Sequence, residues 1–181
     1  DDIMVPTSFN SNLVAINPAI GTGDRLWIES SSSLEIAGEF VQERSNCQFL
    51  FRDVVALHPI TIKGSGVKFT WDSIEFRDAG FILKEAFACG LFGTAISRCQ
   101  GSGIRVDAGG GHMLSIDEIS NCEGAGISLE RSDQNTLRSY QGGNPTIHDC
   151  SIGLLIWGGR RNTAWLHAYN NLYHGIELER T

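Results

Sequence analysis

Two acidic residues in a repeated motif are the best candidates for chemistry in this chain. Asp107 ends the segment ISRCQGSGIRVD, and Glu130 ends the related segment ISNCEGAGISLE, 23 positions further on. A retaining glycosidase uses two carboxyl groups about 5 Å apart, one as acid and base and the other as nucleophile. Like charges that close raise the pKa of one carboxyl, which provides an acid and a base at neutral pH. We therefore predict Asp107 and Glu130 as candidate catalytic residues.

Neighbouring positions in the repeat supply candidate substrate-binding residues. Arg105 is predicted either to hold an anionic sugar or to neutralise Asp107. Trp157 takes the equivalent position one repeat later, where an indole face suits the apolar face of a sugar ring. Glu177 and Glu179 extend the same positions into the last repeat. The alternative is a solvated strand face, because alternating charged and polar residues are usual on exposed sheets.

The elements that position these residues repeat every 23 residues or so. Each repeat has a glycine followed by apolar residues in alternation, which is the period of a β-strand. The residues directly after the glycine are Phe81, Ile104, Ile127, Leu154 and Ile176, with steps of 23, 23, 27 and 22. A turn-rich insertion, QGGNP at 141–145, accounts for the longest step.

Short strands between glycine and asparagine corners describe a chain that returns beneath itself in each repeat. The period excludes helical-pair repeats of about 34 residues, and the LxxLxLxxN signature of leucine-rich repeats is missing. We predict an all-β, single-stranded right-handed parallel β-helix with about 23 residues per coil and roughly 7–8 coils. The first and third residues of each strand should point inward, and the second and fourth should form outward columns.

The domain organisation is predicted from the regularity of the repeats. Residues 1–59 are expected to form irregular N-terminal coils or a cap, and residues 60–181 regular coils of the same single domain. The chain begins without a signal-peptide pattern and stops directly after a repeat motif, so we expect a piece of a longer protein.

Charge and cysteine content limit the classes of partner and cofactor that the chain is expected to bind. A net charge of −7 disfavours nucleic acid, and no apolar run is long enough for membrane insertion. Cys99, Cys122 and Cys150 share one place in the repeat and are predicted to stack in the interior; the alternative is a redox or metal ladder. We predict no metal and no cofactor, because no CxxC occurs and the histidines are scattered: His58, His112, His148, His167 and His174.

The repeat style over residues 60–179 resembles the pectate-lyase-like right-handed β-helix superfamily, which includes pectin lyases, polygalacturonases, polysaccharide epimerases and bacteriophage tailspikes. The NTD and GHG segments of polygalacturonases are missing here, the only DD is Asp1-Asp2, and no calcium-loop spacing occurs. The chain therefore looks most like a tailspike or fibre domain.

That resemblance implies a homotrimeric virion protein, assembled in the host cytoplasm, that recognises a host-surface polysaccharide with or without degrading it. Free cysteines suit a protein that folds in a reducing cytoplasm. Two alternatives stay open. One is a secreted, extracellular polysaccharide lyase, hydrolase or epimerase, and the other is a non-catalytic structural solenoid in an assembly.

Overall fold

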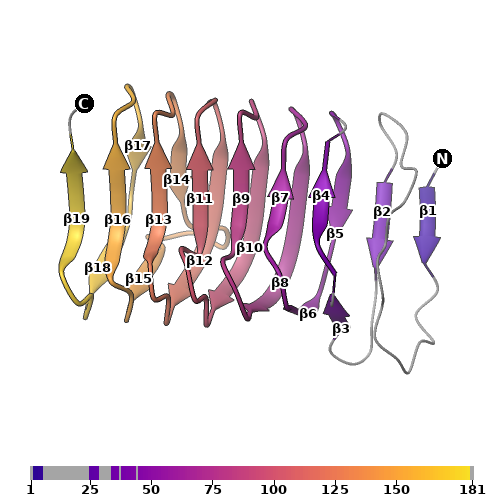
Figure 1. The fold of residues 1–181 in the computed structure, drawn as a ribbon, viewed down its shortest axis with the longest axis horizontal. Helices are drawn as coiled ribbons and strands as arrows, with labels where there is room; N and C mark the ends of the chain where they lie inside the picture. Colours follow the sequence, from indigo (N-terminus) through magenta and orange to yellow (C-terminus); the bar gives the residue numbers. More distant parts are fainter. Residues whose placement is uncertain (1, 6–24, 29–33, 37, 44, 180–181) are drawn as a thin grey trace.

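The chain folds into stacked coils of β-strand (Figure 1). The structure is a computed structural model, and it describes residues 2–5, 25–28, 34–36, 38–43 and 45–179. Every pairing between strands in these ranges is parallel, and no helix occurs in them, so none there is long and apolar enough to cross a membrane. The fold is a parallel β-helix, as the sequence predicted.

One side of the β-helix is a seven-stranded sheet, called sheet B, to which each coil from Phe40 onward contributes one strand. Seven strands separated by six steps give six turns in this sheet. The steps after residue 81 are those predicted from the repeat, because the residue after each glycine pairs with its counterpart in the next coil. The strands are β4 (Phe40–Gln42), β7 (Ile60–Ile62), β9 (Phe81–Lys84), β11 (Ile104–Asp107), β13 (Ala125–Glu130), β16 (Ile152–Trp157) and β19 (His174–Glu179).

The other side is a twelve-stranded sheet, called sheet A. Its central coils each contribute one long strand, β8 (Lys68–Phe76), β10 (Gly90–Ser97) or β12 (Met113–Ser120). Other coils divide the same path into two short strands, so that β12 pairs with both β14 and β15. The remaining strands are β1 (Asp2–Val5), β2 (Arg25–Ile28), β3 (Leu34–Ile36), β5 (Gln48–Leu50), β6 (Asp53–Ala56), β14 (Thr136–Arg138), β15 (Thr146–His148), β17 (Thr163–Ala164) and β18 (His167–Tyr169).

The predicted insertion at 141–145 lies between β14 and β15. The neighbouring β12 runs without interruption along the same path. The extra residues therefore leave the register of both flanking segments intact and form a loop on the outer side of sheet A.

The core follows from strand alternation. The predicted inward residues of β9, β11 and β13 are at most 3% exposed. The residues that alternate with them point to the outer face of the sheet. Aromatic rings fill the N-terminal coils, with Phe69 stacked on Phe49 at 4.4 Å between ring centroids. Burying each such side chain contributes about 1.5–3 kcal/mol. The inward residues of the three strands are Phe81, Leu83, Ile104, Val106, Ile127 and Leu129.

The cysteine prediction is confirmed as an interior stack. Cys99, Cys122 and Cys150 are free thiols that are 1–3% exposed. The hydrogen bond with Cys122 and burial raise the pKa of the Cys150 thiol, which keeps it protonated and unreactive. Among the described residues no group of His, Cys, Asp or Glu could hold a metal ion.

The predicted boundary at residue 60 stays a prediction. Residues 34–36 and 38–43 already pair with later coils in the same sheets. Much of the predicted N-terminal cap, including residues 6–24 and 29–33, lies outside the described residues.

Candidate functional site

The candidate site is a column of outward side chains on sheet B. In the strand register, Asp107 is paired with Glu130, Glu130 with Trp157, and Trp157 with Glu179. Neighbouring strands are ~4.8 Å apart, so these residues occupy successive rungs of one ladder. The structure thus brings together the predicted catalytic and aromatic residues, in the predicted order.

Each carboxylate of the pair is bound to an arginine. Arg105 Nη2 lies 2.8 Å from Glu130 Oε2, and Arg131 Nη2 lies 2.6 Å from Asp107 Oδ1. Ser128, whose side chain is buried under this group, donates a hydrogen bond to Glu130 Oε1 at 3.0 Å. We call Arg105, Asp107, Ser128, Glu130 and Arg131 the carboxylate–arginine cluster.

Arg131 was not predicted from the sequence. It follows the last residue of β13, where its backbone turns into the left-handed region with φ 51°. This corner directs its side chain back to Asp107 on the preceding coil. The repeat offers no signal for it, because the equivalent residues in neighbouring coils are Ala108 and Gly158.

The cluster has a clear chemical character. Its two acids and two guanidinium groups compensate each other's charge, and the contacts fix side chains that are otherwise long and flexible. A guanidinium has five N–H donors, and Arg105 and Arg131 each make one side-chain contact and are partly exposed, so further donors are free for other hydrogen bonds. Such an arrangement suits hydroxyl groups, which both donate and accept hydrogen bonds.

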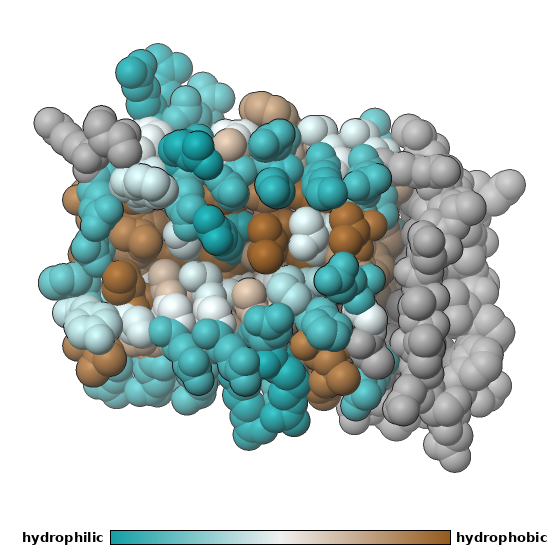
Figure 2. Space-filling view, viewed as in Figure 1, coloured by the Kyte–Doolittle hydropathy of each residue, from teal (hydrophilic) through white to brown (hydrophobic). Residues whose placement is uncertain are grey.

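An aromatic and apolar segment continues the column beyond the cluster. Trp157 is 38% exposed on the rung after Glu130, and Leu155 lies half-buried beside it on β16. Glu177 and Glu179 lie on the last rung, where Glu177 is half-buried and Glu179 is exposed. Figure 2 shows this face, where apolar and weakly polar side chains run along the middle between hydrophilic rows. We call the outward residues of β11, β13, β16 and β19 the sheet B strip: Arg105, Asp107, Ser128, Glu130, Leu155, Trp157, Glu177 and Glu179.

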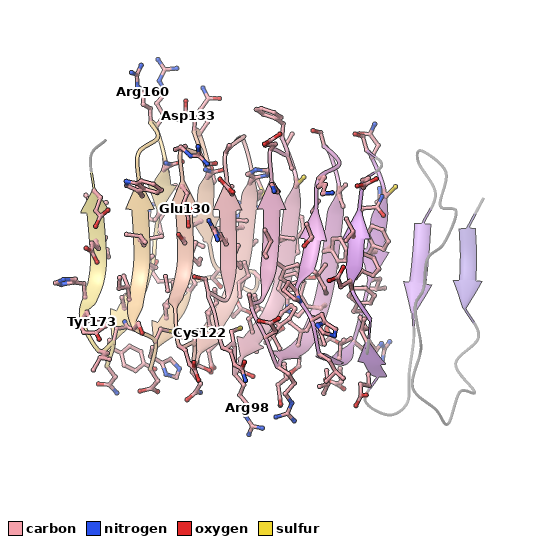
Figure 3. All side chains as sticks on the ribbon, in the orientation of Figure 1. Arg98, Cys122, Glu130, Asp133, Arg160 and Tyr173 are labelled. Carbon is pink, nitrogen blue, oxygen red and sulfur yellow. The ribbon has the colours of Figure 1, made fainter. Side chains whose placement is uncertain are left out.

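A pocket of about 600 Å³ adjoins the strip at the corner that follows sheet B. Its lining includes Arg131 and Glu179 but also Ile156 and Leu178, the inward residues of the last two described coils, so the pocket opens over the end of the stack. Asp133 Oδ1 accepts a hydrogen bond from the backbone N–H of Arg160 at 2.7 Å, which ties the two corners together. In Figure 3 Asp133 and Arg160 project from this corner, beyond the end of the strand that carries Glu130.

A histidine on sheet A is the strongest competing cluster. His148 Nδ1 lies 2.7 Å from Asp149 and Nε2 lies 3.4 Å from Glu118, and its ring stacks on Tyr169. The imidazole is therefore held at both nitrogens and on one face. This environment restrains His148 in a structural position and leaves it little freedom to act on a ligand.

Comparisons with known proteins identify no relative. No family model matches the chain, and no curated protein or solved structure matches it. The class that the strand pairings define is a parallel β-helix solenoid.

Proposed function

We propose that this β-helix recognises an extended polysaccharide along the sheet B strip, as part of a virion spike or fibre that binds a host-surface glycan. The observation that carries the proposal is the register of β11, β13, β16 and β19. That register aligns the carboxylate–arginine cluster, Trp157 and Glu179 on successive rungs of one outward column.

The dimensions of the strip suit a sugar chain. Four rungs extend over three inter-strand steps, which is about 14 Å, or the length of two to three sugar residues. Ion-paired side chains present fixed hydrogen-bond partners for hydroxyls, and an exposed indole offers a flat surface for a pyranose ring. Because these contacts are organised before the ligand arrives, binding loses little side-chain entropy.

Recognition is favoured over cleavage by the pairing of both carboxylates. An acid catalyst must release a proton and a nucleophile must attack, yet Asp107 and Glu130 are each engaged by an arginine. Depolymerisation is the second candidate, supported by the placement of the two acids on adjacent rungs. Release of new reducing ends that stops in Asp107→Asn and Glu130→Gln would establish it.

The spike assignment includes assembly as a homotrimer. Apolar outward residues on sheet B, with Val41 44% and Trp157 38% exposed, support a face that contacts either glycan or a neighbouring subunit. Sedimentation equilibrium measures the mass directly. Three times 19.8 kDa is expected, and a monomer at all concentrations would remove the trimer from the proposal.

A glycan array with matched tryptophan variants tests recognition. The wild-type chain should bind one or more bacterial surface polysaccharides, and Trp157→Ala should weaken that binding at least tenfold, because it removes the stacking surface. Trp165→Ala is the control, since Trp165 is also exposed but lies between β17 and β18 on the other sheet. Equal losses in both variants, or none in Trp157→Ala, would contradict the proposed site.

A further inference from the structure

A second surface that is built for a ligand lies on the outer side of sheet A. Its floor is the ring of Phe92 on β10, which packs against the backbone at Gly90. A Cβ atom on Gly90 would be only 2.3 Å from Phe92 Cε2, so the glycine is what allows this packing.

The insertion loop forms a wall beside this floor. The ring of Tyr140 lies 6.4 Å from that of Phe92, with an angle of 59° between the ring planes. The Tyr140 side chain is 43% exposed although it lies next to another ring. Together the two rings form an aromatic corner in which Phe92 is partly buried and Tyr140 is exposed.

The loop is held rigidly by Asp117 on β12. Its Oδ1 accepts hydrogen bonds from the backbone N–H groups of Tyr140 at 2.7 Å and Gln141 at 2.9 Å, and from the hydroxyl of Ser139. Gln141 Nε2 then donates to Thr94 Oγ1 at 3.3 Å, across three coils. These bonds fix Tyr140 before any ligand binds, which lowers the entropic cost of binding.

Two cations flank the aromatic corner. Lys68 Nζ lies 5.0 Å from the centroid of the Phe92 ring, and Arg138 Nη2 lies 3.4 Å from Met113 Sδ. Within the described part of the chain neither cation forms an ion pair, while the nearby carboxylate of Asp117 is bound to the loop. The nearest outward acid on β8 is Asp72, four residues beyond Lys68.

We propose that Lys68, Phe92, Arg138 and Tyr140 bind a carboxylated sugar of an acidic glycan. The exposed ring of Tyr140 offers apolar surface to the pyranose, and the cations beside Phe92 offer partners for its carboxylate. Lys68 reaches Phe92 on β10 and Arg138 reaches Met113 on the neighbouring strand β12, so the two charges approach one binding region from opposite sides. The chain has a net charge of −7, so two cations without ion pairs beside aromatic rings give this region a local positive charge that contrasts with the whole chain.

This site is independent of the sheet B strip, and its test separates the two. Isothermal titration would use trimers of galacturonate and of mannuronate, sialyllactose, and the carboxyl-reduced form of each. At least one acidic probe should bind, and its carboxyl-reduced form should bind at least tenfold more weakly. Tyr140→Ala should weaken binding at least tenfold and Lys68→Gln several-fold, whereas Trp157→Ala should leave it unchanged.

The control for folding and for nonspecific aromatic contact is Tyr169→Ala. Tyr169 is 47% exposed on sheet A, where its ring stacks on His148 and not on Phe92 or Tyr140. Circular dichroism and the unfolding temperature of each variant confirm that it is folded. Absence of binding by every acidic probe at millimolar concentration would overturn the proposal, and so would unchanged binding in folded Tyr140→Ala.

Discussion

At the scale of single residues, one buried histidine joins a hydrogen-bond ladder at a corner of the coils. His112 Nδ1 accepts a hydrogen bond from the backbone N–H of Cys89 at 3.2 Å. In the next coils Asn135 Oδ1 accepts from His112 N–H, and Asn162 Oδ1 accepts from Asn135 N–H. His112 Nδ1 thus accepts a backbone hydrogen bond as the Asn135 and Asn162 side chains do in the following coils. Because Nδ1 is the acceptor, the ring proton lies on Nε2.

This histidine should make stability depend on pH. Burial lowers the pKa of His112 from 6.5 to about 4. The unfolded chain takes up the proton below pH ~6.5 and the folded chain only near pH 4, so stability falls as pH drops through that window. The loss attributable to His112 should reach about 3 kcal/mol. Urea unfolding at pH 7 and pH 4.5 measures it.

The matched variant is His112→Asn, which keeps an acceptor for Cys89 N–H but does not titrate. Its stability should fall by less than that of the wild type between pH 7 and pH 4.5, while other groups contribute equally to both. Parallel pH profiles for the two proteins would show that His112 does not carry the effect.

The recurrent glycine of each repeat is explained by close contact between coils. A Cβ atom on Gly80 would lie 1.9 Å from the carbonyl oxygen of Gly103 in the next coil. Gly103, Gly126 and Gly153 each face the next glycine carbonyl at under 3 Å in the same way. Gly175, on the last coil, meets nothing closer than 3.4 Å.

Alanine substitutions at the two ends of this glycine column should therefore differ. Gly80→Ala should lower the free energy of unfolding by about 1–3 kcal/mol, because the coils must shift apart to accommodate a methyl group. Gly175→Ala should change it by less than about 0.5 kcal/mol. Chemical denaturation of both variants measures this, and equal effects would contradict the stacking contact.

The sequence predicts the positions of residues that recur in each repeat, but it does not predict contacts made by residues that occur once. The outward positions of Asp107, Glu130 and Trp157 follow from the two-residue alternation of a β-strand, combined with the 23-residue period of the coils. Arg131 contacts Asp107 from a left-handed corner, and Asp117 holds the insertion loop. Neither contact is repeated in the other described coils. A repeat pattern averages over coils, so it carries no information on such single contacts.

At the scale of the strands, the inward column of sheet B shows how stacking controls burial. Leu83, Leu129 and Leu178 hold the same place in their strands. Leu83 is fully buried and Leu129 is 3% exposed, but Leu178 on β19 is 72% exposed. The sequence identifies all three as inward, whereas their burial depends on a coil on either side.

Truncating this column should have an effect that depends on the coil. Leu83→Ala should cost about 2–5 kcal/mol, since it leaves a cavity in a core covered on both sides. Leu178→Ala should cost less than about 0.5 kcal/mol. Thermal or urea unfolding provides both values, and a large loss in Leu178→Ala would mean that this residue is covered in solution.

The strand pattern also predicted the insertion at 141–145 but not its structure. Glycine and proline indicate a turn without specifying which side of the coil it leaves. The path of the loop is set by Asp117, which lies 24 residues before Gln141 on another coil. Only the stacking of coils brings the two together.

At the scale of the whole molecule, the fold gives two independent outer surfaces. The sheet B strip carries an internally paired cluster with a tryptophan, and sheet A carries the aromatic corner with two unpaired cations. Repetition every ~4.8 Å lets both surfaces extend over several coils. A rigid, elongated scaffold of this kind suits a ligand that is itself a repeating chain.

Nuclear magnetic resonance with the best-binding oligosaccharide from the array tests the function of the sheet B strip most directly. The indole N–H signal of Trp157 and the amides of β11, β13 and β16 should shift on titration. Trp71 is an internal control, because it is fully buried and its indole N–H donates to the carbonyl of Ala95 at 2.9 Å. Shifts at Trp157 with an unchanged Trp71 are the predicted result, and a bound ligand that leaves Trp157 and these strands unchanged would contradict the account.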